Sequence, residues 1–96
     1  MGISVYLENQ IHERIGRVYD DADESFMRAC ELAPVGSVMR SVIRHGDTML
    51  NVYQLRIFEA ELQGLPGGEI TDAISGVMDA ATAAIRRRGY LYFVGD

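Results

Sequence analysis

The closing segment Tyr90–Val94 is apolar at every position. Such a pattern is typical of a strand that is paired on both edges and covered on at least one face. The first segment, from Ile3 to Glu8, instead alternates apolar and polar residues with a period of two, as a strand with one buried face does. We therefore predict that the closing strand lies in the middle of a sheet or beside this first strand.

A second strand is predicted from about residue 11 to residue 19, with a bulge at Gly16, where the alternation fails. The first two strands then form a hairpin. Apolar residues at helical spacing predict helices after residues 20–24, from Ser37, from Asp47 to about Gln63, and from about Glu69 to Arg88. The helix from Asp47 is apolar on two sides, which is typical of burial between two layers.

These elements predict an α+β fold. We expect a small three-stranded sheet, made of the N-terminal hairpin and the C-terminal strand, packed under a layer of three to four helices. A chain of 96 residues is predicted to form a single domain over residues 1–96.

The N-terminus has no basic region and reaches a charge at Glu8, so we expect neither a signal peptide nor a membrane span. The one cysteine, Cys30, has no internal disulfide partner, which favours a reducing compartment. We therefore expect a cytoplasmic protein with no membrane partner.

The chain is acidic, with a net charge of −5, and its nine basic residues are all arginine. General nucleic-acid binding requires concentrated lysine and arginine to replace counterions, so we expect no nucleic-acid partner. An acidic balance favours solubility and would speed encounter with a cationic protein.

Few residues suit metal or catalytic chemistry. The two histidines, His12 and His45, and Cys30 lack the spacing of a zinc site, and the acidic run at residues 20–24 lacks the frame of a calcium loop. That run suits helix capping or a solvated turn. No nucleophile has an adjacent base and orienting group, so we expect a protein that is not an enzyme and has no metal or cofactor.

One group of polar residues suits binding: Arg44, His45, Asp47, Asn51 and Gln54. If Asp47 caps a helix, then Asp47, Asn51 and Gln54 share one helix face and interrupt an apolar stripe. Buried amides without hydrogen bonds cost roughly 1–3 kcal/mol each, so these amides need partners. Two interpretations stay open. The amides either bond to nearby backbone and fix how the helix docks, or form the floor of a shallow recognition site, where His45 beside Asp47 is placed for proton transfer.

The segment Gly46–Gln54 resembles a Gly-Asp-Thr-x-x-Asn-x-x-Gln stretch found in small uncharacterised bacterial proteins. Those proteins also open with a strand like Val5-Tyr6-Leu7-Glu8 and finish with one like Leu91-Tyr92-Phe93-Val94-Gly95-Asp96. His45 departs from the pattern, where an aromatic residue is expected. The resemblance implies a bacterial origin and a similar fold, and it carries no known activity.

Three functional hypotheses follow. The first is a non-catalytic domain that binds another protein, as immunity proteins and small inhibitors do, with the aromatic closing strand suited to an interface. The second is a small-molecule binder or minor enzyme with its site at His45, Asp47, Asn51 and Gln54. The third is a self-associating structural protein, a homo-oligomer joined through a sheet edge or the face that bears Tyr6.

Overall fold

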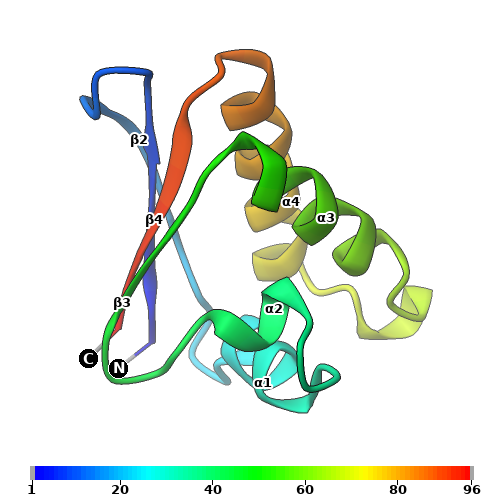
Figure 1. Ribbon diagram of the computed structural model, residues 1–96. Coiled ribbons are helices and arrows are strands. Elements are labelled where there is room, and N and C mark those ends of the chain that lie inside the picture. Colours follow the sequence, from blue (N-terminus) through cyan, green and yellow to red (C-terminus); the bar gives the residue numbers. More distant parts are fainter. Residues whose placement is uncertain (1, 96) are drawn as a thin grey trace.

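An antiparallel sheet with the strand order β2-β1-β4-β3 forms one layer of the molecule (Figure 1). The computed structural model describes residues 2–95, and within them the chain forms four strands and four α-helices. Their bounds are β1 (Ser4–Glu8), β2 (Arg14–Tyr19), α1 (Ser25–Leu32), α2 (Val38–Ser41), β3 (Asp47–Leu50), α3 (Val52–Gln63), α4 (Asp72–Arg86) and β4 (Tyr90–Val94), with a short 3-10 helix at Gly67–Glu69. The predicted α+β class is confirmed. The predicted three-stranded sheet is wrong, because β3 adds a fourth strand.

The apolar strand β4 lies between β1 and β3 and is paired on both edges. Leu91 and Phe93 point into the core and are completely buried, whereas Tyr90, Tyr92 and Val94 alternate with them and are half-buried. The position predicted for this strand, beside the first strand, is therefore correct.

The hairpin of β1 and β2 contains a bulge, at which Ile15 is the extra residue on β2. The bulge therefore lies one residue before Gly16, and β2 begins at Arg14, later than predicted. The intervening turn is closed by Asn9, whose side-chain oxygen accepts hydrogen bonds from two backbone amides of the turn at 3.1 and 2.9 Å.

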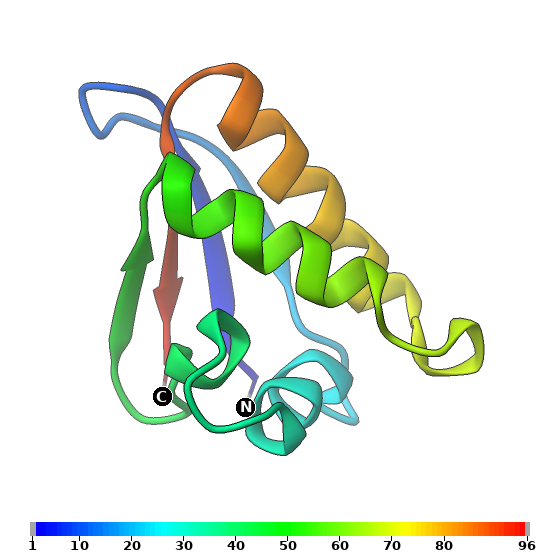
Figure 2. The ribbon, with the colours of Figure 1, turned by 45° about the vertical axis from the view of Figure 1, so that its right-hand side comes forward.

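The helices cover one face of the sheet (Figures 1 and 2). Helix α4 contacts β1, β2 and β4, and α3 contacts β3 and β4, while α1 and α2 pack beside them at the end of the sheet where β1 begins. Phe26, Phe58 and Phe93 meet in the core with ring centroids 5.6–6.2 Å apart. No helix in residues 2–95 has the length and apolar character needed to cross a membrane.

Two carboxylates from neighbouring elements cap the helices α1 and α2. Asp20, directly after β2, accepts hydrogen bonds from two backbone amides of α1, each at 3.0 Å. Glu61 of α3 accepts from two backbone amides of α2 at 3.0 and 2.8 Å. Because the first amides of a helix have no partner within it, these carboxylates stabilise both helix starts and attach each helix to its neighbour.

The segment Asp47–Leu50 is a strand, so the predicted helix start at Asp47 is wrong. Its residues pair with β4, with Met49 opposite Tyr92. A strand of four residues is too short for its alternation to be distinguished from helical spacing, and its partner lies more than 40 residues further along the chain.

Helix α3 is covered on one side only, which corrects the predicted burial between two layers. Leu55, Phe58 and Leu62 are fully buried, whereas Tyr53 and Ile57 are 80% and 55% exposed. Within residues 2–95 no further layer lies outside this helix (Figure 2), so Tyr53 and Ile57 stay exposed.

The end of α4 depends on two neighbouring residues. Arg88 takes the left-handed conformation, with φ at 53°, and the amide of Gly89 bonds back to the carbonyl oxygen of Ala84 at 2.9 Å. Gly89 is buried against β1, where a Cβ atom would lie 2.0 Å from the carbonyl oxygen of Glu8. A residue without a side chain is therefore required where the chain passes from α4 into β4.

Candidate functional site

The predicted polar site does not have the geometry from which it was inferred. Asn51 is the N-cap of α3, and its side-chain oxygen accepts from the amide of Gln54 at 3.0 Å. The Gln54 side chain returns the bond, accepting from the amide of Asn51 at 2.9 Å. This reciprocal arrangement is a capping box. Both side chains are exposed, so the expectation that the two amides are buried is wrong.

Arg44 is held by structural ion pairs. Its guanidinium lies 2.7 Å from a carboxylate oxygen of Glu24 and donates two hydrogen bonds to Glu31, at 3.0 and 2.7 Å. The hydrogen bonds to Glu31 raise the pKa of Arg44 most, and the bond to Glu24 raises it further. The hydrogen bonds from Arg44 in turn lower the pKa of Glu31. Arg44 thereby joins the loop before β3 to α1.

The other members of the predicted site are spread along β3. His45 is exposed in the loop before the strand, Asp47 is the first residue of the strand, and Asn51 follows its last residue. Four residues of extended chain place Asp47 and Asn51 about 13 Å apart. Asp47 and Asn51 thus lie at opposite ends of β3, and a role in binding for each of the five residues stays a prediction.

A different surface is built by the sheet, because its second face carries no helix (Figure 1). On this outer face, β1 and β4 present the side chains that alternate with core residues. The pairing registers place one residue from each strand in a single row, which we call the tyrosine row: Arg17 of β2, Tyr6 of β1, Tyr92 of β4 and Met49 of β3.

Two arginines of β2 are stacked on tyrosine rings of this face. The guanidinium carbon of Arg14 lies 3.8 Å from the ring centroid of Tyr6, and that of Arg17 lies 5.5 Å from the same ring and 4.5 Å from the ring of Tyr19. Arg17 also donates a hydrogen bond to the hydroxyl of Tyr6 at 3.2 Å. Cation–π contacts of this kind hold the two charged groups in defined positions.

A buried carboxylate lies at one end of the same face. Glu8 is 5% exposed, and one of its oxygens lies 2.9 Å from Nδ1 of His12 while the other lies 3.8 Å from Nε of Arg14. His12 in turn stacks on the ring of Tyr90, with centroids 4.2 Å apart. Buried charge requires such partners, so these contacts stabilise the turn of the hairpin over β4.

At the opposite edge, the hydroxyl of Tyr92 donates a hydrogen bond to Asp47 at 3.2 Å. This bond, together with the negative charge of Asp47, raises the pKa of Tyr92. Tyr92 is therefore a neutral hydrogen-bond donor at physiological pH, and of the residues predicted for the binding site, Asp47 is the one that the structure places on the outer sheet face.

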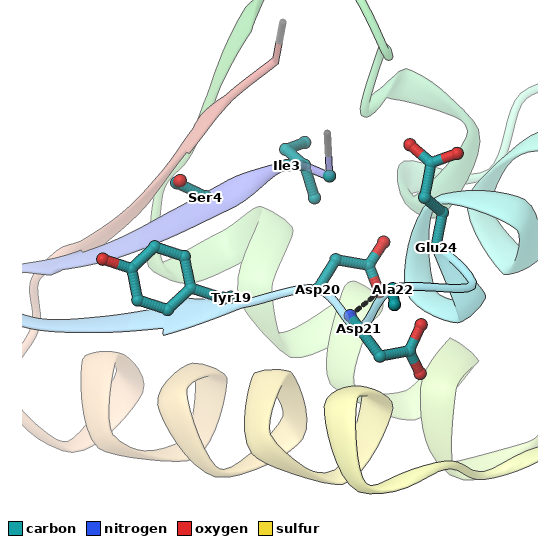
Figure 3. Close-up of a pocket in the computed structure, with 8 residues that line it drawn as sticks. Ile3, Ser4, Tyr19, Asp20, Asp21, Ala22 and Glu24 are labelled. Atoms are coloured by element: carbon teal, nitrogen blue, oxygen red, sulfur yellow. Dashed lines mark hydrogen bonds between the residues drawn. The ribbon is translucent and has the colours of Figure 1, made fainter.

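A hollow of about 640 Å³ lies where β2 leads into α1, lined by the start of β1 and by Asp20, Asp21 and Glu24 (Figure 3). Asp21 and Glu24 point to opposite sides of the chain in this view. Asp21 accepts two hydrogen bonds from Ser25, at 2.8 and 2.5 Å, which lower the pKa of Asp21. With Asp20 capping α1 and Glu24 paired with Arg44, the acidic run is a capping segment, one of the two roles predicted for it.

Cys30 and the side chains of metal-ligand type are candidates for nucleophilic and metal chemistry within residues 2–95. Cys30 is fully buried in α1, and this burial raises the pKa of its thiol, so that the reactive thiolate does not form near neutral pH. Within residues 2–95, no three side chains of histidine, cysteine, aspartate or glutamate are grouped in a way that would hold a metal ion.

The fold and the outer face define the class: an α+β protein with helices on one side of an antiparallel sheet and stacked tyrosine and arginine side chains on the other. No family model matches the sequence, and comparisons with curated proteins and with solved structures likewise gave no match. The resemblance of Gly46–Gln54 to small bacterial proteins therefore stays a prediction.

The outer face was only partly visible in the sequence. The alternation of Tyr6 and Tyr92 with core residues places both tyrosines on the solvent side of their strands. The approach of Arg14 and Arg17 to these tyrosines depends on the bulge and on the pairing of distant strands, which no local pattern reveals.

Proposed function

We propose that the chain is a non-catalytic protein-binding domain that docks on a partner protein through the outer face of its sheet. One observation carries the proposal: the helix-free face combines half-buried tyrosines with two arginines that are already fixed by stacking. Tyrosine and arginine are the residue types enriched at the energetically important centres of protein interfaces.

The size of the face favours a transient partner over a stable dimer of this chain. Four strands about 4.8 Å apart, each of five residues at about 3.4 Å, give the sheet face a projected flat area of about 330 Å². This area is small beside the roughly 800 Å² of accessible surface that each partner buries in a stable complex. Weak signalling encounters lie at this small end of the range.

An obstruction of the outer face tests the proposal. Ser4 lies on this face of β1 and Ser75 is exposed on α4, so Ser4→Trp and Ser75→Trp add the same uncharged bulk on opposite sides of the molecule. Tagged wild-type protein and both variants are used to capture partners from native lysate at low salt, after circular dichroism has shown equal folding.

We expect a defined protein that is retained by the wild type and by Ser75→Trp and is lost with Ser4→Trp. Capture that is unchanged by Ser4→Trp, or a wild-type protein that retains no partner, would refute docking through this face. Sedimentation of the purified wild type at several concentrations covers self-association, and a stable dimer that Ser4→Trp disrupts would also contradict the proposal.

A further inference from the structure

The outer face has two halves of different chemistry. Over β2 and β1 lie the two stacked guanidinium groups of Arg14 and Arg17, which we call the cationic half. Over β4 and β3 lie Tyr92, whose hydroxyl is bonded to the carboxylate of Asp47, and Met49, which is 46% exposed. The tyrosine row crosses both halves in the order β2, β1, β4, β3.

The two arginines of the cationic half differ in how their charge is balanced within residues 2–95. Arg17 is exposed, and among the residues that the structure describes no carboxylate pairs with it; its polar contact is the hydroxyl of Tyr6. Arg14 meets Glu8 only at 3.8 Å, and Glu8 is closer to His12. The outer face therefore presents Arg17 as a guanidinium group that no carboxylate within residues 2–95 neutralises.

Both arginines are also positioned in advance of binding. Each guanidinium lies over a tyrosine ring, so part of the rotamer entropy that an interface normally costs has already been lost in the free protein. Guanidinium groups bind carboxylates through paired N–H···O bonds of defined geometry. A carboxylate on the partner protein therefore complements this half.

The spacing of the sheet sets the length of the complementary segment. Arg17 and Met49 stand three strands apart, about 14 Å at about 4.8 Å per strand. An extended segment crossing the strands at about 3.4 Å per residue covers this distance in about four residues, with alternate side chains facing the sheet. Positions i, i+2 and i+4 then meet the cationic half, Tyr92 and Met49 in turn.

We propose, as a deepening of the proposed function, that the partner protein presents an extended acidic segment of the pattern Asp/Glu-x-apolar-x-apolar. Its carboxylate binds Arg17 and Arg14, and its two apolar side chains lie on Tyr92 and Met49. Single-stranded nucleic acid also stacks on aromatic rings, but two guanidinium groups on an acidic chain release few counterions, which favours the short acidic peptide.

Selection from a random library tests the pattern. Phage displaying random peptides of twelve residues are selected on the wild-type domain, and bound peptides are synthesised and measured by fluorescence anisotropy at low salt. A dodecamer of thymidine is measured in parallel as the nucleic-acid probe. Arg17→Ala removes one of the two guanidinium groups of the outer face. Arg56→Ala makes the same change at an exposed position of α3.

We expect the selected peptides to share an acidic residue followed at +2 and +4 by apolar residues. Their affinity should fall at least tenfold with Arg17→Ala, fall less with Arg17→Lys, and stay unchanged with Arg56→Ala. Selected peptides without an acidic position, an equal affinity for Arg17→Ala, tighter binding of the oligonucleotide, or no selected peptide at all would each overturn this inference.

The two proposals fail in distinguishable ways. In one case, Ser4→Trp abolishes the capture of a lysate partner and Arg17→Ala leaves this capture unchanged. That result would keep the sheet face as the docking surface and reject the acidic segment. If Ser4→Trp leaves the capture of a partner unchanged, the docking surface itself is rejected, whatever the peptides show.

Discussion

Replacement of Asp20 by asparagine tests how the sheet is attached to α1. The Oδ1 atom of Asp20 accepts from the amides of Asp21 and Phe26, at 2.9 and 3.0 Å, and the Oδ2 atom accepts from the amide of Met27 at 3.0 Å. Asparagine has the same shape, but it offers one acceptor oxygen and turns an NH₂ group toward the amide of Met27. One helix-start amide then faces a donor in place of an acceptor.

The expected loss follows from these contacts. A hydrogen bond to a charged acceptor contributes about 1.5–3 kcal/mol, and a negative charge at a helix start contributes about 0.3–1 kcal/mol. We therefore expect Asp20→Asn to lower the free energy of unfolding by about 2–3 kcal/mol. For a domain of this size, that corresponds to a fall in the melting temperature of about 10–20 °C.

Urea and thermal unfolding followed by circular dichroism measure this change. The matched control is Asp23→Asn, which removes the same charge at an exposed residue whose side chain has no hydrogen bond or ion pair within residues 2–95. The control should stay within about 0.5 kcal/mol of the wild type. Equal losses in the two variants would show that general charge, and not the cap, explains the effect, and the reasoning would be refuted.

Three further predictions concern local geometry. Gly89→Ala should destabilise the fold by about 3 kcal/mol in urea unfolding, because its Cβ atom would meet the Glu8 carbonyl at 2.0 Å; a loss below about 1 kcal/mol would contradict this. Arg88→Gly should raise stability by about 1 kcal/mol, since φ is 53° there, and a loss of stability would show that the arginine side chain matters more. Ser25→Ala should raise the depressed pKa of Asp21 toward the ordinary value of an aspartate in an NMR titration. Because that pKa is lowered by folding, the contribution of Asp21 to stability is present above about pH 4 and lost as the pH falls through the folded value; an unshifted titration would contradict the Ser25 bond.

Local patterns in the sequence were sufficient where one segment determines its own structure. The alternation in the first strand and the wholly apolar segment Tyr90–Val94 each lie within a single element and have the role that their pattern predicted. The run at residues 20–24, between β2 and α1, has one of the two roles predicted for it. Hydrophobic periodicity acts over neighbouring residues, and so it can be read without knowledge of the rest of the chain.

The predicted burial of Asn51 and Gln54 is wrong because it depended on a helix phase. The helix begins at Val52 and not at Asp47. The side-chain amides of Asn51 and Gln54 therefore form an exposed capping box and do not lie on the buried helix face that the prediction assumed. Each residue of shift rotates a helix by about 100°, so an error of a few residues changes which side chains are enclosed.

The sequence by itself determined the α+β class of the fold and the place of the last strand beside the first. Only the tertiary structure decided that Asp47–Leu50 pairs as an edge strand and that Arg14 and Arg17 stack on Tyr6. Both depend on contacts between segments far apart in the chain. Such pairings are selected by the energy of the whole packed sheet, which no single segment contains.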